Sequence, residues 1–226
     1  MSTIKAIVVD IDGTLTDMRR HISTEAIQAI REMPIPVVLA SGNVICFMRA
    51  ASKLIGASEA IIGETGGVIQ AGYDSSPVVL ADIEECRRAA AMLKKHFPDM
   101  EQLDARYRMS ELAFRRNIDL AGAGKLLDEE YPGLEIIDTM FALHLKHKSV
   151  NKGTGMVKIA GLMGLKPKDF AAMGDSRNDL PMFKEASVGI AVGNAVPELK
   201  AMATHVTMES YGEGAAEGFR WLKQRL

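Results

Sequence analysis

The chain has 226 residues, of which 47% are hydrophobic and 25% are charged, and these fractions are typical of a folded globular protein rather than a disordered chain. Its 27 Lys and Arg against 29 Asp and Glu give a net charge of -2, which provides no general electrostatic reason to expect a nucleic acid or an anionic membrane as a partner. An anionic ligand would therefore need a local binding site.

The cysteines and the hydropathy pattern both favour a cytoplasmic protein. Cys46 and Cys86 form neither a CxxC pair nor a zinc-binding spacing, which indicates a reducing compartment. The short apolar run at the N-terminus is followed at once by carboxylates, unlike a signal peptide. No stretch reaches the roughly 18 uninterrupted apolar residues of a membrane span, so we expect no membrane partner. The sequence leaves the oligomeric state open and is compatible with a homo-oligomer.

Apolar runs and amphipathic segments alternate at the start of the chain. Ile4 to Val9 is nearly all apolar and β-branched, which is typical of a strand buried on both faces of a parallel sheet. Ser23 then opens an amphipathic segment that Pro34 ends, and this pattern indicates a helix. The expected elements are a strand at 4–9, a helix at 23–33, a strand at 36–40, a helix at 44–54 and strands at 60–62 and 68–69.

The same alternation returns near the end of the chain. We expect strands at 170–173 and 188–192 on either side of a helix at 179–185. Strands that alternate with helices in this way predict an α/β fold with a doubly wound, Rossmann-like parallel sheet.

The middle of the chain, from about residue 77 to 149, has a different pattern. Two helix-like segments, 82–97 and 120–131, occur together with strand-like runs that are suited to hairpins. The runs are 111–115, 134–137 and 141–145. We therefore expect residues 77–149 to form a small α+β cap, inserted into an α/β core made of residues 1–76 and 150–226.

Two carboxylates follow the first predicted strand in the segment 10–14, DIDGT. Alternate residues of an extended segment share a side, so Asp10 and Asp12 can face one point, while Gly13 allows a sharp turn. Ligands of doubly wound folds bind at the carboxyl ends of the strands. A solvated acidic turn is the alternative, and the apolar strand directly before the carboxylates favours a binding site.

A second pair of carboxylates, Asp175 and Asp179, follows the strand predicted at 170–173. If Asp179 begins a helix, residues four apart lie close together, and both side chains can border the same cavity. Oxygen ligands collected from separate strand ends suit Mg2+, which prefers octahedral oxygen coordination. Asp179 is also a favourable N-cap residue, and the two roles are compatible.

Two further segments carry groups that bind phosphate. Ser41, Gly42 and Asn43 follow a predicted strand at a helix start, where N–H groups and the helix dipole attract anions, although such residues are also common in turns. Lys152 precedes another predicted helix, and a lone lysine is most often a solvated surface charge. Four Asp carboxylates would repel a phosphate ester, however, and a lysine together with a divalent cation would offset most of that charge.

The cap segment and its neighbours contain weaker candidates. Arg115 and Arg116 are able to pair with a substrate carboxylate, although a solvated cap surface is their more ordinary place. His144 and His147 lie three apart on a predicted strand, so they are expected on opposite faces rather than at one metal.

The main motifs together resemble the haloacid-dehalogenase-like phosphohydrolases. DIDGT, ASGN, NKG and GDSRND occur in the order of that family's four motifs, from residue 10 to residue 179. The resemblance implies an Mg2+ cofactor, Asp10 as the nucleophile that forms an aspartyl-phosphate, and Asp12 as general acid and base. It further implies the ligands of the metal and of the phosphoryl group. For Mg2+ these are Asp10, the Asp12 carbonyl and Asp175, with Asp179 binding directly or through water. For the phosphoryl group they are Ser41 and Lys152, supported by Gly42, Asn43 and Asn178.

Within the family, GETGGVI at 63–69 and GDSRNDLPMF at 174–183 are similar to the archaeal-type phosphoglycolate phosphatases, with Thr65 where many relatives carry Asn. This similarity implies hydrolysis of a small phosphate ester, preferably 2-phosphoglycolate. A broad sugar-phosphate phosphatase is the alternative within the same chemistry, and a phosphomutase shares the nucleophile and the acid. A binding module without turnover is the alternative from another class, but binding alone does not require both a nucleophile and a neighbouring acid.

Overall fold

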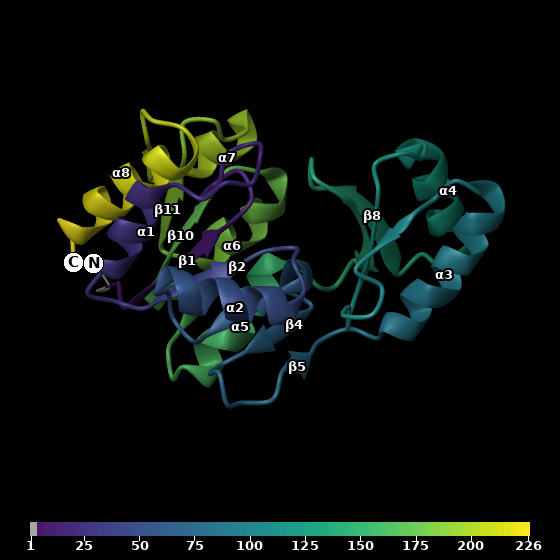
Figure 1. Ribbon diagram of the computed structural model, residues 1–226, viewed down its shortest axis with the longest axis horizontal. Helices are drawn as coiled ribbons and strands as arrows, with labels where there is room; N and C mark the ends of the chain where they lie inside the picture. Colours follow the sequence, from purple (N-terminus) through teal and green to yellow (C-terminus); the bar gives the residue numbers. More distant parts are fainter. Residues whose placement is uncertain (1–3) are drawn as a thin grey trace.

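A large sheet runs through the main part of the molecule, and a smaller sheet lies to one side of it (Figure 1). The structure is a computed structural model that describes residues 4–226. The large sheet has eight strands in the order β12-β11-β10-β1-β2-β3-β4-β5. Their bounds are β1 Ala6–Asp10, β2 Val37–Ala40, β3 Ile61–Gly63, β4 Val68–Gln70, β5 Val78–Val79, β10 Phe170–Gly174, β11 Val188–Ala191 and β12 His205–Val206.

Neighbouring strands are parallel from β12 through to β3, and antiparallel from β3 to β5. The first strand, β1, lies between β2 and β10, and all of its residues are buried. An almost entirely apolar strand is suited to this position because helices cover both of its faces. The arrangement confirms the predicted α/β fold with a doubly wound parallel sheet.

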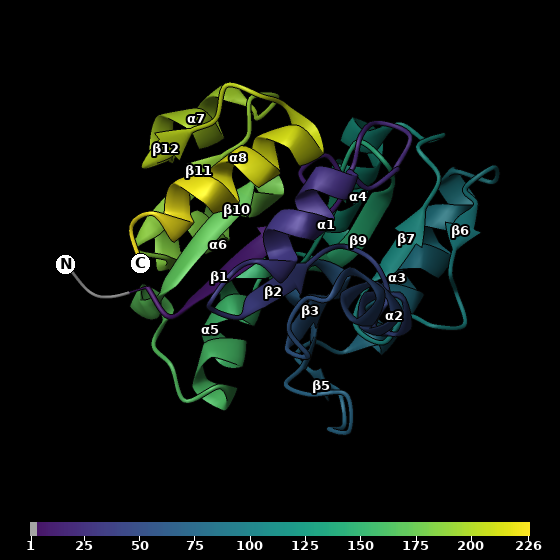
Figure 2. The ribbon, with the colours of Figure 1, turned by 60° about the vertical axis from the view of Figure 1, so that its left-hand side comes forward.

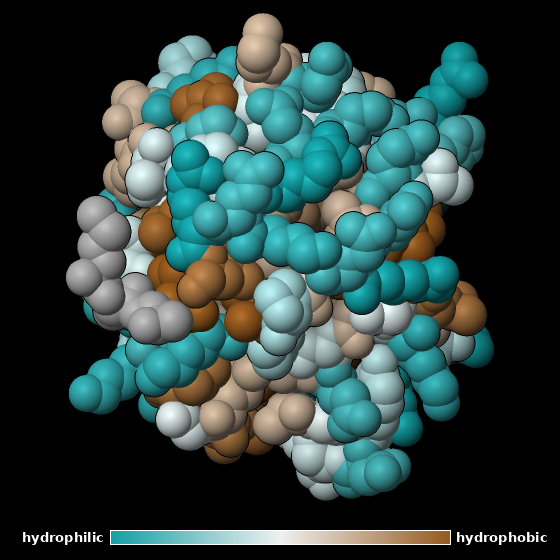
Figure 3. Space-filling model, turned by 90° about the vertical axis from the view of Figure 1, so that its left-hand side faces the viewer, coloured by the Kyte–Doolittle hydropathy of each residue, from teal (hydrophilic) through white to brown (hydrophobic). Residues whose placement is uncertain are grey.

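Helices cover both faces of the large sheet (Figures 1 and 2). On one face α1 packs against α8 and α2, and on the other α5 packs against α6, which contacts α7. The bounds are α1 Thr24–Arg31, α2 Ile45–Ile55, α5 Lys152–Leu162, α6 Leu180–Glu185, α7 Pro197–Met202 and α8 Tyr211–Lys223. Figure 3 shows the end of the molecule opposite the smaller sheet, where hydrophilic side chains surround a group of hydrophobic ones. Within residues 4–226, no helix has the length and apolar character needed to cross a lipid bilayer.

The segment 77–149, called the cap segment below, contains the smaller sheet, an antiparallel one in the order β6-β7-β9-β8. Two helices, α3 and α4, pack with it around a second apolar core. The bounds are α3 Ile83–His96, β6 Gln102–Leu103, β7 Leu112–Phe114, α4 Leu120–Glu130, β8 Leu134–Asp138 and β9 Leu143–His147. Leu143 and Leu145 of β9 belong to this core, whereas His144 between them lines a cavity shared with the large sheet.

The edge of the large sheet reaches into the cap segment. By pairing with β4, β5 extends the sheet to Val79, past the predicted core boundary at residue 76. The division of the chain at 76 and 150 stays a prediction, and residues 1–3 of the predicted core lie outside the described residues.

Candidate active site

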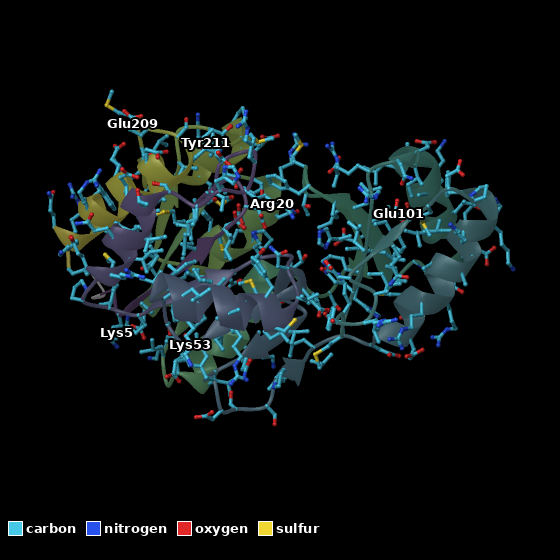
Figure 4. The ribbon with its side chains drawn as sticks, in the orientation of Figure 1. Lys5, Arg20, Lys53, Glu101, Glu209 and Tyr211 are labelled. Carbon is cyan, nitrogen blue, oxygen red and sulfur yellow. The ribbon has the colours of Figure 1, made fainter. Side chains whose placement is uncertain are left out.

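The four motifs meet at the edge of the large sheet where β1, β2 and β10 end, as the carboxyl ends of parallel strands must. Figure 4 shows this region, near Arg20, between the core and the cap segment. A cavity at this edge is lined by residues of the core and of the cap segment. Seven of the predicted site residues line it, namely Asp10, Asp12, Ser41, Gly42, Asn43, Lys152 and Asn178.

The other two predicted residues, Asp175 and Asp179, join the site through Asp10. One carboxylate oxygen from each of the three aspartates lies within 4.8 Å of the others. Thr14, which is not among the predicted site residues, donates a hydrogen bond of 3.0 Å from its hydroxyl to Asp175 Oδ1. The structure therefore brings together all of the side chains that the motifs predict for the site.

Lys152 links two of these acidic residues. Its Nζ donates to Asp10 Oδ1 and to Asp179 Oδ1, the latter at 2.6 Å, and all three side chains are buried. A capping box formed by Asn151 and Thr154 starts α5 and places Lys152 in the first turn of that helix. Lys152 is thus a buried member of the site and not a solvated surface charge.

Asp179 occupies the N-cap position of α6, but its side chain makes no capping hydrogen bond there. Its Oδ2 instead accepts from the backbone N–H groups of Asp175 (3.0 Å) and Ser176 (2.9 Å). The carboxylate is directed back toward the end of β10, where Lys152 reaches it. The side chain thus forms a capping box with Ser176 at the short helix before α6 and also contacts Lys152, so the two expected roles are compatible. A role of Asp179 at a metal stays a prediction.

Two glycines allow the carboxylates to pack this closely. Gly13 has φ +91°, and a Cβ at this residue would lie 2.5 Å from Asp175 Oδ2. A Cβ at Gly174 would lie 2.6 Å from Asp179 Cγ. Larger residues would push the acidic side chains apart, so the glycines of the motifs are needed for the cluster itself.

Burial and mutual repulsion shift the proton affinities in this cluster. Burial raises the pKa of Asp10 well above its ordinary value; Lys152 lowers it, and Asp179 and Asp175 raise it further. The pKa of Asp175 is raised to about 7, first by burial and then by the charge of Asp179. Burial lowers the pKa of Lys152, but Asp10 and Asp179 outweigh this effect and raise it above its ordinary value. The Lys152 ammonium group therefore stays charged, and the carboxylates of the cluster outnumber it.

The cluster fits a divalent cation. Three carboxylates face one ammonium group, so the fully ionised cluster has a surplus of negative charge. Asp10 Oδ2 is buried and has no hydrogen-bond partner among the described residues, which is unusual for a buried polar atom. A set of hard oxygen donors is also the set that Mg2+ and similar cations prefer.

Asp12 lies in the same cavity, but its carboxylate has separate partners. Ser41 Oγ (3.2 Å) and Asn43 Nδ2 (2.8 Å) donate to its Oδ2. Arg20 Nε lies 3.3 Å from its Oδ1. The Asp12 side chain thus borders the predicted phosphate-binding segment, where a general acid and base is required. The role of the Asp12 carbonyl as a metal ligand stays a prediction.

The cap segment contributes a buried ionic group that no sequence motif predicts. Glu111 Oε1 accepts a hydrogen bond of 2.6 Å from Arg108 Nη1 and lies 2.7 Å from His144 Nδ1. Burial would raise the pKa of Glu111, but His144 and Arg108 hold it below its ordinary value. Both Arg108 and His144 line the cavity. No local motif reveals this group, because His144 meets Glu111 only once β7 and β9 pair.

The loop that carries Arg108 is attached to the core. Glu64, in the 3-10 turn η1 (Glu64–Gly66), accepts from the backbone N–H of Ser110 (2.7 Å) and from that of Met109 (3.0 Å) through its Oε2. Arg108 Nη1 also donates to the carbonyl of Gly42 at 3.0 Å. The cap segment therefore contacts the predicted phosphate-binding segment directly.

The arginines considered from the sequence lie elsewhere in the cap segment. Arg115 is exposed and pairs with Glu101 at 2.7 Å, and Figure 4 places Glu101 on the cap segment, away from Arg20. Arg116 pairs with Asp138 at 2.8 Å and is also well exposed. Both arginines thus have the surface role that was the more ordinary expectation.

The fold and the site together define a class of hydrolases. A sequence profile of the haloacid dehalogenase-like hydrolases matches residues 7–111 and 101–219. This chain belongs to that family.

Relatives in this family are similar over almost the whole chain. A protein named phosphoglycolate phosphatase from Methanosarcina mazei is 43% identical over 219 residues, which are 97% of this chain and 96% of that protein. One of the same name from Archaeoglobus fulgidus is 45% identical over 218 residues, 96% of each chain. A crystal structure of a Thermoplasma acidophilum protein has a TM-score of 0.88 at 29% identity and covers 98% of this chain and 99% of its own.

Proposed function

We propose that this chain is a Mg2+-dependent phosphomonoester hydrolase that acts through an aspartyl-phosphate on Asp10 and prefers 2-phosphoglycolate. The observation that carries the proposal is the placement of Asp10 and Asp12 in one cavity with different partners. Lys152 contacts Asp10, whereas hydrogen-bond donors from the segment 41–43 contact Asp12. A nucleophile and a neighbouring acid and base are what covalent phosphoryl transfer requires, and binding alone needs neither.

In the first step, a carboxylate oxygen of Asp10 attacks the phosphorus, and the bond between the phosphorus and the leaving oxygen breaks. Asp12 gives its proton to that oxygen, so the alcohol leaves in neutral form and the phosphoryl group stays on Asp10. For 2-phosphoglycolate the alcohol is glycolate.

In the second step, the ionised Asp12 takes a proton from water, and the water oxygen attacks the phosphorus. The bond between the phosphorus and Asp10 breaks, which releases inorganic phosphate. Asp10 is again a carboxylate and Asp12 again carries a proton, so water is the only other reactant consumed.

Asp10, Asp175 and Asp179, with the carbonyl of Asp12, would hold the Mg2+, whose positive charge stabilises the oxygens of the transferred group. Lys152 orients Asp10 and adds a second positive charge at the floor of the cavity. Ser41, Gly42, Asn43 and Asn178 border the same cavity and are the proposed contacts of the phosphoryl group.

The choice of 2-phosphoglycolate is supported by the two relatives named phosphoglycolate phosphatase, which are 43% and 45% identical to this chain over 219 and 218 residues. A sugar-phosphate phosphatase is the second candidate within the same chemistry.

We further propose that the enzyme is cytoplasmic, which its free cysteines Cys46 and Cys86 support, and that residues 77–149 act as a cap over the site.

Phosphate release from a panel of esters tests the proposal. The panel contains 2-phosphoglycolate, several sugar phosphates and p-nitrophenyl phosphate, each measured with Mg2+ and with a chelator. We expect kcat/KM to be highest for 2-phosphoglycolate and activity to disappear with the chelator. Equal activity on all esters would leave a broad phosphatase, and activity that needs added sugar bisphosphate would indicate a mutase.

A further inference from the structure

We infer that Arg108 binds a carboxylate of the leaving group through its Nε and Nη2 atoms and thereby selects acidic phosphate esters. The inference rests on the proposed function and adds the residue that distinguishes the substrate. Its basis is the position of the Arg108 side chain against the cavity. An arginine whose side chain is only 3% exposed lines the catalytic cavity while part of its hydrogen-bonding capacity stays unused.

The guanidinium plane of Arg108 is held by one of its nitrogens. Nη1 donates to Glu111 Oε1 at 2.6 Å and to the carbonyl of Gly42 at 3.0 Å. One acceptor belongs to the cap segment and the other to the core, so the orientation of the group depends on both. Glu111 is itself held by His144 Nδ1 at 2.7 Å.

The other two nitrogens of Arg108, Nε and Nη2, have N–H groups that are available to a ligand. Nε is buried and has no hydrogen-bond partner in the described part of the chain. The carboxylate of Asp104 lies 3.8 Å from Nη2, which is too long for a hydrogen bond. Nε and Nη2 form one edge of the guanidinium group, and two parallel N–H donors on such an edge match the two oxygens of a carboxylate. A buried donor without an acceptor is destabilising, so this edge is suited to a ligand.

The position of Arg108 restricts the ligand to a short one. Its Nη1 contacts the carbonyl of Gly42, and Gly42 directly follows Ser41, a proposed contact of the phosphoryl group. A molecule that reaches both the phosphoryl site and the Arg108 edge must therefore carry its carboxylate close to the ester oxygen. His144 also lies close to Gly42, because a Cβ at Gly42 would be 3.2 Å from His144 Nε2.

The other cations that line the cavity are less suited to this task. Lys152 is occupied by Asp10 and Asp179. Arg20 pairs with Asp12, and its side chain is 49% exposed, so a carboxylate bound there would compete with water. The carboxylate of Asp104 is well exposed and can turn into solvent when a substrate carboxylate approaches Arg108.

The test compares two esters that differ mainly at the carboxylate, 2-phosphoglycolate and 2-hydroxyethyl phosphate. The wild-type chain, Arg108→Gln and Arg108→Lys are assayed with Mg2+, and the ratio of the two kcat/KM values is the readout. Arg115→Gln is the matched control because Arg115 is an exposed arginine of the cap segment paired with Glu101. We expect the wild type to prefer 2-phosphoglycolate and Arg108→Gln to reduce this ratio by about 10- to 150-fold, the range for a lost hydrogen bond to a charged group.

Arg108→Lys should also lower the ratio, because it keeps the charge but loses the paired donors, and Arg115→Gln should leave it unchanged. An equal loss on both esters would overturn the inference, since Arg108 would then serve the phosphoryl group or the fold. A wild type that hydrolyses both esters equally well would overturn it too, and this comparison needs no variant to fold. Failure of the proposed function would look different, because neither these esters nor p-nitrophenyl phosphate would release phosphate.

Discussion

Arg20 Nε lies 3.3 Å from Oδ1 of Asp12, whereas Ser41 and Asn43 donate to the other oxygen of that carboxylate. The same guanidinium lies 4.8 Å from the centroid of the Phe141 ring, which the cap segment provides between β8 and β9. Arg20 has φ +64°, a backbone conformation that is rare for a residue with a side chain. One residue of the core therefore contacts both the proposed acid and base and the cap segment.

Replacement of Arg20 should impair turnover more than stability. Arg20→Ala removes the contacts to Asp12 and Phe141, and we expect kcat for 2-phosphoglycolate to fall about 2- to 10-fold, since a partly exposed cation–π contact or ion pair is worth about 1 kcal/mol or less. Arg49→Ala is the matched control, because the Arg49 guanidinium lies 5.9 Å from the centroid of the Tyr73 ring in a similar contact. Neither Arg49 nor Tyr73 lines the cavity. Steady-state kinetics on both variants checks the prediction, and equal effects would contradict it.

Asp10→Asn should abolish hydrolysis and leave the fold intact. An amide cannot act as the nucleophile, and loss of a catalytic nucleophile lowers kcat by at least about a thousandfold. Because Asp10 is one of several buried carboxylates with raised pKa, the variant should melt at or above the wild-type temperature when both are free of metal. Phosphate release and thermal unfolding measure the two effects. A well-folded variant with wild-type activity would exclude Asp10 as the nucleophile.

Gly13→Ala should disturb the carboxylate cluster. Its Cβ would lie 2.5 Å from Asp175 Oδ2, and φ +91° is unfavourable for alanine. We expect weaker Mg2+ binding, seen as a smaller rise in melting temperature when Mg2+ is added.

Gly161→Ala in α5 is the control for this substitution. Apart from its chain neighbours and the backbone of its own helix, no described atom lies within 4 Å of a Cβ at that residue. Alanine should therefore stabilise the helix by about 0.5–1 kcal/mol without a change in Mg2+ binding. If the two variants responded to Mg2+ alike, the close approach of Asp175 to Gly13 would have no role in metal binding.

The stability of the chain should depend on Glu111 in acid. The pKa of Glu111 in the folded chain is lower than the ordinary 4.5, so below that value the unfolded chain binds more protons. Glu111 thus adds stability above pH 4.5, and this contribution is lost as the pH falls from 4.5 through the lower pKa of the folded chain.

Glu111→Gln should remove this part of the pH dependence and lower the free energy of unfolding at pH 7 by about 3–5 kcal/mol, because Arg108 loses its buried partner. Urea unfolding across the acid range measures both effects. Glu101→Gln, which breaks the exposed pair with Arg115, should change stability by less than about 1 kcal/mol. A similar small change for both variants would show that the buried pair contributes little.

The two cysteines should react at very different rates. Cys46 is exposed, whereas Cys86 is buried in the apolar core of the cap segment, and burial raises the pKa of its thiol to about 12. Because the thiolate is the reactive form, a disulfide reagent at pH 8 should modify Cys46 in the native protein and both residues after unfolding. Rapid modification of Cys86 in the native protein would mean that the cap segment opens readily.

The proposed nucleophile and metal ligands are predictable because they stand at the ends of strands whose pattern is plain in the sequence. Asp10 ends an apolar run, and Asp175 follows one, so parallel pairing of β1 and β10 is enough to bring them together. The same reasoning does not reach Arg108 and Glu111, which meet His144 only through the pairing of β7 and β9. Their side chains carry no local spacing that marks a site.

The elements that the sequence does not predict are those whose stability comes from tertiary contacts. The glycines in the first turns of α8 disfavour a helix in isolation, and its packing against α1 compensates for them. The strands β6 and β12 have two residues each, too few for a periodic pattern, and they form by pairing with β7 and β11.

Chemical trapping of the phosphoenzyme tests the central claim most directly. Borohydride reduces an acyl phosphate to an alcohol, so enzyme quenched with it during turnover of 2-phosphoglycolate in Mg2+ should carry homoserine in place of Asp10, as read by peptide mass spectrometry. The same treatment without substrate, or with Asp10→Asn, should leave the residue unreduced. Continuous phosphate release with no reduction at Asp10, or with reduction at another carboxylate, would contradict the mechanism.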